Sequence, residues 1–168
     1  MKQLWAPWRM EYISQEESET SRSCIFCSRI TQNRDKKNLI VFRGELAFII
    51  MNRFPYNNGH LMVVPYRHTG DLLQLKKDEK AELFQLLQRS MKALEAVMKP
   101  QGYNIGMNLG RVAGAGVEDH LHFHVVPRWN GDTNFMPILS DTKVISEALE
   151  KSYQKLQAAF TQLGGRKK

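Results

Sequence analysis

The segment VEDHLHFHVVPRW, residues 117–129, places His120, His122 and His124 on every second position of a run that is otherwise largely apolar. The chain contains five histidines in all, so three in this register demand an explanation. On a β-strand, residues two apart point to the same face of the sheet. We therefore expect the three histidines to form one polar row on a strand. The residues expected to face the core on the other side are Leu121, Phe123 and Val125.

The spacing limits what this histidine row can do. A strand rises ~3.3 Å per residue, which puts the outer two histidines ~13 Å apart, whereas zinc–nitrogen bonds are ~2.0–2.1 Å long. One metal ion therefore cannot take all three, although a neighbouring pair can share one. Neutral histidine is a nucleophile toward phosphorus, and flanking histidines can contact phosphate oxygens or supply a proton. Clustered titratable groups favour such a site over three ordinary strand residues.

Further apolar runs and two amphipathic segments surround this strand. The runs predicted to be strands are residues 39–42, 46–51, 60–65, 103–109 and 120–127. Apolar residues that recur every three or four positions predict helices at 77–99 and 144–163. Strands first, then a helix, more strands and a final helix indicate an α+β domain. We expect a mainly antiparallel sheet with one long helix and a C-terminal helix.

Length, composition and charge narrow the class of protein. A chain of 168 residues with 42% hydrophobic and 24% charged residues is typical of one globular domain. The apolar runs are too short to cross a bilayer, and the amino-terminal residues lack the apolar stretch of a secretory signal, so we expect a cytoplasmic protein without membrane contact. The formal net charge of +7 favours anionic partners, but no DNA- or RNA-binding motif accompanies it, so specific nucleic-acid binding is not expected.

A glycine-rich loop, GRVAGAG, leads into the histidine strand. Its backbone N–H groups are unobstructed by side chains and suit an anion. We take Gly114, Ala115 and Gly116 as candidate nucleotide-binding residues, although a plain hairpin connection explains the glycines equally well.

The two cysteines, Cys24 and Cys27, lie in the motif CIFC. Two are too few for a disulfide scaffold, and their spacing is typical of metal ligands. Two reduced thiols and a redox pair are the alternatives, but no βαβ pattern surrounds the motif to support the redox reading.

The motif HLHFHVV resembles the signature of the histidine-triad (HIT) family, in which histidine alternates with hydrophobic residues. AFIIMNRFPYNNGHLMVVPYRHTGDLLQL is similar to the family's upstream block, and GMNLGRVAGAGVEDHLHFHVVPRWNGD to its downstream block. The resemblance implies a HIT-like catalytic domain over residues 24–137. Residues 1–23 are then expected to be a leader that packs on the core, and residues 138–168 a C-terminal helix and basic tail of the same domain.

The resemblance implies a nucleotidyl hydrolase or transferase that acts on the α-phosphate of a dinucleoside polyphosphate or a related nucleotide conjugate. His122 would be the nucleophile that takes up the nucleotidyl group, His124 would contact the α-phosphate, and His60 would be a further active-site histidine. An adenine or other purine nucleotide is the expected substrate. The residues implied to bind it, besides His124 and the glycine-rich loop, are Asn52 at the ribose, Asn108 near the phosphates, and Phe42 and Ile50 at the base. Without the resemblance, strand-end or turn capping is the simpler role for both asparagines.

The sequence departs from the family pattern just before the triad. Many members carry Gly-Gln-Ser or Gly-Gln-Thr there, whereas this chain has AGVED, with neither a glutamine nor a hydroxyl side chain. The segments LWAPWRMEYI, CIFC and VVPRWNGDTNFMPI resemble a microbial subgroup that includes diadenosine tetraphosphate phosphorylases, in which inorganic phosphate is the acceptor. The alternatives are a nucleoside phosphoramidate hydrolase and a nucleotide-binding module with little catalysis. The resemblance also implies a homodimer.

The family pattern also bears on the cysteines. Some bacterial members are expected to bind zinc through two cysteines and two histidines, and the positions match here. The resemblance therefore implies a structural zinc site made of Cys24, Cys27, His68 and His120. It would tie the amino-terminal part of the domain to the end of the histidine strand.

Overall fold

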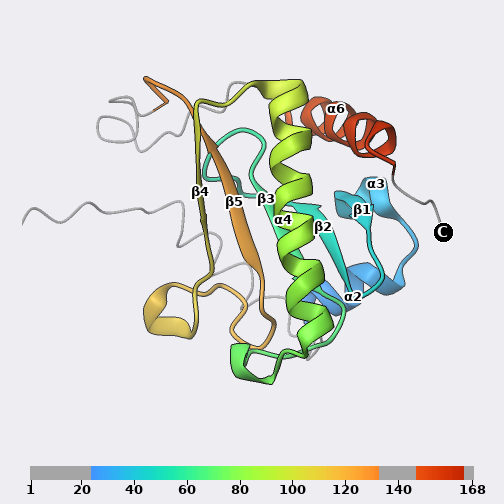
Figure 1. The fold of residues 1–168 in the computed structure, drawn as a ribbon, viewed down its shortest axis with the longest axis vertical. Coiled ribbons are helices and arrows are strands. Elements are labelled where there is room, and N and C mark those ends of the chain that lie inside the picture. Colours follow the sequence, from blue (N-terminus) through green and yellow to red (C-terminus); the bar gives the residue numbers. More distant parts are fainter. Residues whose placement is uncertain (1–23, 133–146, 165–168) are drawn as a thin grey trace, which may run out of the picture.

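The core of the protein is one five-stranded antiparallel sheet, with the strands in the order β1-β2-β3-β5-β4 (Figure 1). The computed structural model describes residues 24–132 and 147–164. The strands are β1 (Ile40–Arg43), β2 (Ala47–Met51), β3 (Leu61–Pro65), β4 (Gly102–Gly106) and β5 (Phe123–Arg128). The helices are α2 (Ile25–Thr31), α3 (Asp35–Asn38), α4 (Lys77–Met98) and α6 (Leu149–Gln162), with short 3-10 turns at η1 (Leu72–Gln74) and η2 (Arg111–Ala113).

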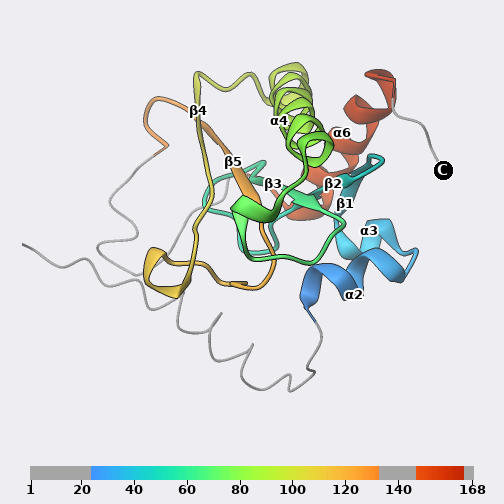
Figure 2. The same ribbon diagram turned by 60° about the horizontal axis from the view of Figure 1, so that its bottom comes forward.

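Helices cover both faces of the sheet. The long helix α4 packs on β2, β3 and β5, and α6 packs on α4 and β1. Figure 2 shows α2 on the opposite side of the sheet from α4. Every residue of β2 and β3 is buried, because these two strands lie inside the sheet and are covered on both faces. The expected α+β architecture is confirmed.

The strand register decides which side chains reach the histidines. Ile50 of β2 pairs with Met62 of β3, which pairs with His124 of β5. Directly opposed residues of antiparallel strands share a face, so these three side chains line one surface. Phe123 lies on the other surface, where its ring contacts Phe84 of α4 at a centroid distance of 6.2 Å. We call the surface that carries His124 the histidine face.

The strand that contains the histidines begins later than the alternation predicts. β5 starts at Phe123, so His120 and His122 precede it rather than belong to it. The backbone N–H of Leu121 donates to the carbonyl of Thr69, which follows β3, so Leu121 does not pair with a residue of β3. Leu121 is buried as expected, whereas Phe123 is only half-buried.

Other boundaries also differ from the prediction. β4 ends at Gly106 instead of residue 109, and α6 begins at Leu149 instead of residue 144, although residues 144–146 lie outside the described part. Leu163, expected on the packed side of this helix, is 41% exposed because it follows the last helical turn. The helices α2 and α3 were not predicted from the sequence. The predictions for residues 1–23 and for the basic tail at 165–168 lie outside the described residues.

No helix in the described ranges, 24–132 and 147–164, combines the length and the apolar character that crossing a bilayer requires.

A buried carboxylate fixes the start of α4. Glu79 accepts hydrogen bonds from the backbone N–H of Lys76 at 2.7 Å and from Arg67 Nε and Nη2 at 2.8 Å each. The Arg67 guanidinium, and to a lesser degree the Lys76 N–H, holds the pKa of Glu79 below its usual range. The ionised form therefore stabilises the fold at neutral pH, and this contribution is lost as the pH falls through the lowered pKa.

We expect Glu79→Gln to lower the free energy of unfolding by about 2 kcal/mol, because the amide leaves the guanidinium and the helix N-terminus poorly paired. Chemical denaturation at neutral pH measures the loss, with Glu95→Gln, at an exposed position of the same helix, as the control. The difference between wild type and Glu79→Gln should shrink below the lowered pKa of Glu79. A Glu79→Gln protein as stable as the control at neutral pH would contradict this role.

Candidate active site and metal centre

Three histidines meet where β3 and β5 run side by side. His60 immediately precedes β3, and His124 is the second residue of β5. His60 Nε2 lies 3.0 Å from His124 Nδ1, and the ring centroids of His122 and His124 are 4.9 Å apart with the rings nearly perpendicular. The structure thus brings together the three residues expected to be catalytic.

The hydrogen bonds around His60 define where its proton lies. The backbone N–H of Tyr56 donates to His60 Nδ1 at 3.1 Å, so this nitrogen carries a lone pair. The proton of neutral His60 is therefore on Nε2, from which it is donated to His124 Nδ1. Neutral His124 in turn carries its own proton on Nε2. This arrangement makes His124 Nε2 a hydrogen-bond donor on the histidine face.

Neutral His122 is the other tautomer, with its proton on Nδ1 instead of Nε2. Its Nδ1 lies 2.9 Å from the carbonyl oxygen of His120, which can only accept, so Nδ1 carries the proton and Nε2 the lone pair. Burial lowers the pKa of His122, although the bond to the carbonyl partly opposes this shift. The environment therefore favours a neutral ring whose free nitrogen is Nε2. This is the form that can attack phosphorus.

A second cluster joins three parts of the chain that are distant in sequence. One ligand atom from each of Cys24, Cys27, His68 and His120 lies within 4.8 Å of all the others. His120 Nδ1 is 3.2 Å from Cys24 Sγ, 3.6 Å from Cys27 Sγ and 3.3 Å from His68 Nδ1. Ligand atoms around a tetrahedral ion with bonds of ~2.0–2.3 Å are ~3.3–3.8 Å apart. The spacing therefore fits one metal ion bound by two sulfurs and two nitrogens.

The partners of the cluster also suit a metal. His120 Nε2 lies 2.8 Å from the carbonyl of Pro65, so it donates its proton there and leaves the lone pair of Nδ1 facing the other ligands. Burial raises the pKa of the Cys27 thiol, and the neighbouring Cys24 raises it further. The Cys27 thiol therefore resists ionisation unless a cation lies beside it. The four residues could thus hold a metal, as predicted.

The residues expected to bind the nucleotide divide between the two faces of the sheet. The side chain of Asn52 lies 3.4 Å from His60 Nδ1, and it also accepts the backbone N–H of Phe54. Ile50 is fully buried on the histidine face. Phe42, by contrast, pairs with Ile49, stacks on Phe160 of α6 and lies under the guanidinium of Arg89 of α4.

Phe42 lies on the face of the sheet that α4 covers, and its expected role at the base stays a prediction. A bulge between Ile40 and Phe42 shifts the β1 register by one residue, which turns Phe42 toward α4 and away from His124. Phe42 contributes to the packing between α4 and α6.

The glycine-rich loop forms a tight turn beside the end of β4. Gly110 and Gly114 flank η2 with φ values of +79° and +88°, a conformation that favours glycine. The side chain of Asn108 donates to the carbonyl of Gly114 at 3.1 Å and so braces the loop. Ala115 is buried, whereas Gly116 is exposed. The predicted phosphate contacts of Asn108 and this loop stay predictions.

Two aromatic residues of the site were not predicted from the sequence. The Phe26 ring of α2 contacts the rings of His120 and His122 at centroid distances of 5.3 and 5.2 Å. Tyr56 lies against His60 and His124 at 4.8 and 5.7 Å. Both hold histidine rings in place. Their only sequence signal was their position, Phe26 between the cysteines and Tyr56 in the loop before His60.

Several known proteins resemble this chain. The family model described as HIT domain matches residues 33–131. The chain is 42% identical to a protein of Mycobacterium tuberculosis named AP-4-A phosphorylase, over 89% of this chain and 79% of that protein. It is 32% identical to the adenosine 5′-monophosphoramidase of Schizosaccharomyces pombe, over 64% of this chain and 76% of that protein.

A solved structure is also similar. It is the crystal structure of a Zn-bound histidine triad family protein from Mycobacterium smegmatis, with a TM-score of 0.68 and 31% identity, and the match covers 84% of this chain and 95% of that one. An antiparallel sheet with alternating histidines at the start of one strand is the architecture of a nucleotide-processing histidine-triad protein. The chain belongs to the HIT domain family.

Proposed function

We propose that this protein is a nucleotidyl hydrolase or transferase that cleaves a dinucleoside polyphosphate at its α-phosphate through a covalent nucleotidyl-histidine. The observation that carries the proposal is the proton arrangement of His122. Its Nδ1 is committed to the carbonyl of His120, so the lone pair of Nε2 is available to attack. The name of the M. tuberculosis relative supports diadenosine tetraphosphate as the substrate.

The proposed reaction has two displacement steps. His122 Nε2 forms a bond to the α-phosphorus as the bond from that phosphorus to the bridging oxygen breaks, and the departing nucleotide takes the electron pair. His124 Nε2–H donates to a phosphate oxygen and stabilises charge in the transition state. In the second step an oxygen of inorganic phosphate, or of water, attacks the same phosphorus and releases His122. His60 keeps His124 in the donating orientation through the 3.0 Å contact.

The acceptor decides between phosphorolysis and hydrolysis. The relative's name favours inorganic phosphate, whereas the phosphoramidase relative favours water as acceptor and a P–N bond as the scissile bond. Because the first step is common to these reactions, only the products separate them. With diadenosine tetraphosphate, we expect ADP and ATP when phosphate is present.

Chromatography of the products with and without phosphate, with adenosine 5′-phosphoramidate as a parallel substrate, tests this expectation. AMP formed equally fast in both conditions would mean that the protein is a hydrolase. Turnover of the phosphoramidate alone would contradict the proposed substrate.

We further propose that the ion held by Cys24, Cys27, His68 and His120 is zinc and that its role is structural. Four protein ligands would close a tetrahedral site and leave no position for substrate. The ion would link the start of α2 to the segment just before His122. These residues therefore position the nucleophile but take no part in the displacement steps.

A homodimer is part of the same proposal. Within the described residues, β4 is an edge strand with one unpaired side, and Asn104, Ile105 and Gly106 on it are exposed. An unpaired edge with an exposed apolar side chain is a site where a second chain can add. Light scattering of the purified protein measures the oligomeric state.

A further inference from the structure

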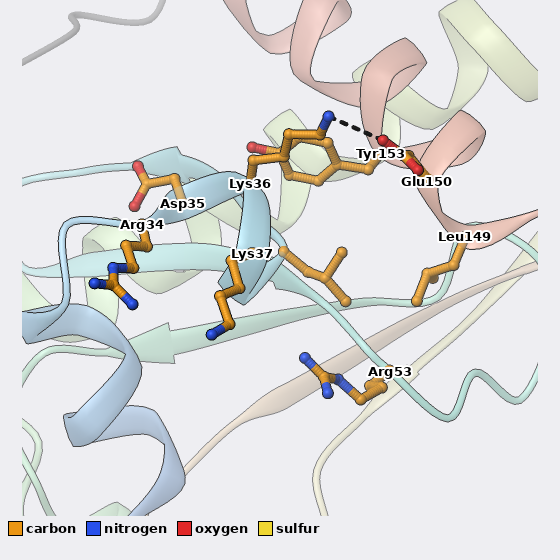
Figure 3. A pocket seen from close by; sticks show the side chains of 9 residues that line it. Arg34, Asp35, Lys36, Lys37, Arg53, Leu149, Glu150 and Tyr153 are labelled. Atoms are coloured by element: carbon orange, nitrogen blue, oxygen red, sulfur yellow. Dashed lines mark ion pairs between the residues drawn. The ribbon is translucent and has the colours of Figure 1, made fainter.

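A pocket of about 730 Å³ lies outside the histidine cluster, between α3, the start of α6 and the loop that follows β2 (Figure 3). Its volume falls in the range of ~300–1,000 Å³ that is common for small-molecule sites. The residues that line it are Arg34, Asp35, Lys36, Lys37, Leu39, Arg53, Leu149, Glu150 and Tyr153. Neither the expected catalytic residues nor the cysteine–histidine cluster accounts for it.

The side chains that line this pocket carry more positive than negative charges. Four cations line it against two carboxylates. Both carboxylates already have partners, because Asp35 pairs with Arg43 at 2.7 Å and Glu150 pairs with Lys36 at 2.9 Å.

This leaves Arg34, Lys37 and Arg53 without a carboxylate partner among the described residues. Figure 3 shows the charged ends of these three side chains on the same side of the pocket, away from the Lys36–Glu150 pair. Cations grouped in this way favour a ligand with several negative charges, and guanidinium groups bind phosphate through two parallel hydrogen bonds.

The same pocket offers apolar surface. Leu149 is half-buried at its wall, and buried Leu39 and Tyr153 form its deeper part. The aliphatic stems of the exposed lysines and arginines add to this surface while their charged ends stay in water. A ligand that matches both properties carries phosphate groups at one end and a flat or apolar group at the other.

Arg53 connects this pocket to the active site. It directly follows Asn52, whose side chain contacts His60. Arg53 and Leu149 also line a smaller cavity of about 350 Å³, which Asn52 and His60 line as well. A ligand that binds Arg53 would therefore lie beside the loop that holds the active-site histidine.

We propose that this pocket is a second nucleotide-binding site, in which Arg34, Lys37 and Arg53 bind the phosphates and the apolar wall contacts the nucleoside. The choice of a nucleotide among phosphorylated molecules rests on the proposed function. Its source is either the far half of a dinucleoside polyphosphate held at His122 or a separate mononucleotide.

Calorimetric titration of the full-length His122→Asn protein tests the proposal without turnover. With ATP we expect two molecules bound per chain. Arg34→Glu/Lys37→Glu in the same background should weaken one of the two by about tenfold or more, because each cation that contacted phosphate becomes a repelling carboxylate. The control is Lys80→Glu/Lys92→Glu, which changes the net charge equally on the exposed side of α4 and should leave both sites intact. Melting temperatures verify that each variant is folded.

Titration with diadenosine tetraphosphate separates the two sources. One molecule per chain, weakened by Arg34→Glu/Lys37→Glu, means that the pocket holds the far half of the substrate. Two per chain means a separate nucleotide. Equal stoichiometry and affinity in the pocket variant and the control, for both ligands, would overturn the proposal. If the protein binds one ATP and the pocket variant loses it, the pocket is a nucleotide site but the histidines do not bind ATP. The pocket proposal and the proposed function can therefore fail independently.

Discussion

The His122→Asn protein should bind nucleotide with nearly unchanged affinity and turn it over about a thousandfold more slowly or worse. Asparagine is close in size to the imidazole and can keep a hydrogen bond to the carbonyl of His120, but its amide nitrogen has no lone pair for attack on phosphorus. The loss should appear in kcat rather than in substrate affinity, because the covalent bond forms only after binding.

His124→Ala is the informative comparison for this prediction. It removes the donor to the phosphate but leaves the nucleophile, so it should slow the reaction and still form the covalent intermediate. His122→Asn should form none. Substantial turnover by a folded His122→Asn protein would assign the attack to another group, and equal intermediate formation by both variants would have the same meaning.

The second large effect should come from loss of the metal. It should lower the stability of the protein, and activity should fall as a consequence. Cys24→Ser/Cys27→Ser removes both sulfurs and leaves His68 and His120 as an incomplete pair of ligands. We expect the bound metal to fall from about one ion per chain to near zero. The free energy of unfolding should fall by about 3 kcal/mol or more, which lowers the melting temperature by about 6–12 °C for a domain of this size.

Ser28→Ala is the matched control on α2, since its hydroxyl bonds within the same helix and takes no part in the cluster. Elemental analysis of protein purified without added zinc measures the metal, and calorimetry measures the melting temperature. A chelator should reproduce the effect of the double substitution on wild type and have no further effect on the variant. Wild-type protein that lacks metal and melts like the variant would refute the metal site.

The parts of this structure that follow a simple period were predictable from the sequence. Short continuous apolar runs predicted the strands at 46–51 and 60–65, and both faces of these strands are buried. The period of three to four located α4 to within one residue of its C-terminal end. The cysteine spacing and the resemblance grouped Cys24, Cys27, His68 and His120, which the structure brings within 4.8 Å of one another.

The features that were missed depend on contacts between distant segments. The start of β5 at Phe123 follows from the bond between Leu121 and Thr69 and from the bond between His120 and Pro65. Alternation alone cannot reveal these partners. The position of Phe42 on the α4 side of the sheet also could not be predicted, because a bulge in β1 shifts its register, and a one-residue shift reverses the direction of every later side chain.

The pocket lined by lysines and arginines could not be predicted from the sequence either. Nothing in the sequence distinguishes Arg34, Lys37 and Arg53 from the other basic residues of the chain. Only the fold brings α3, the β2–β3 loop and α6 to one cavity. The net charge of +7 indicated an anionic partner but not where its charges would be bound.

The most direct test of the account is to look for the nucleotidyl-histidine itself. Wild-type protein mixed briefly with diadenosine tetraphosphate in the absence of phosphate, then quenched at alkaline pH to protect the P–N bond, should gain the mass of one AMP group per chain. Peptide mapping should place that group on His122, and added phosphate should discharge it as ADP. Turnover without any such adduct, or an adduct on a residue other than His122, would contradict the proposed mechanism.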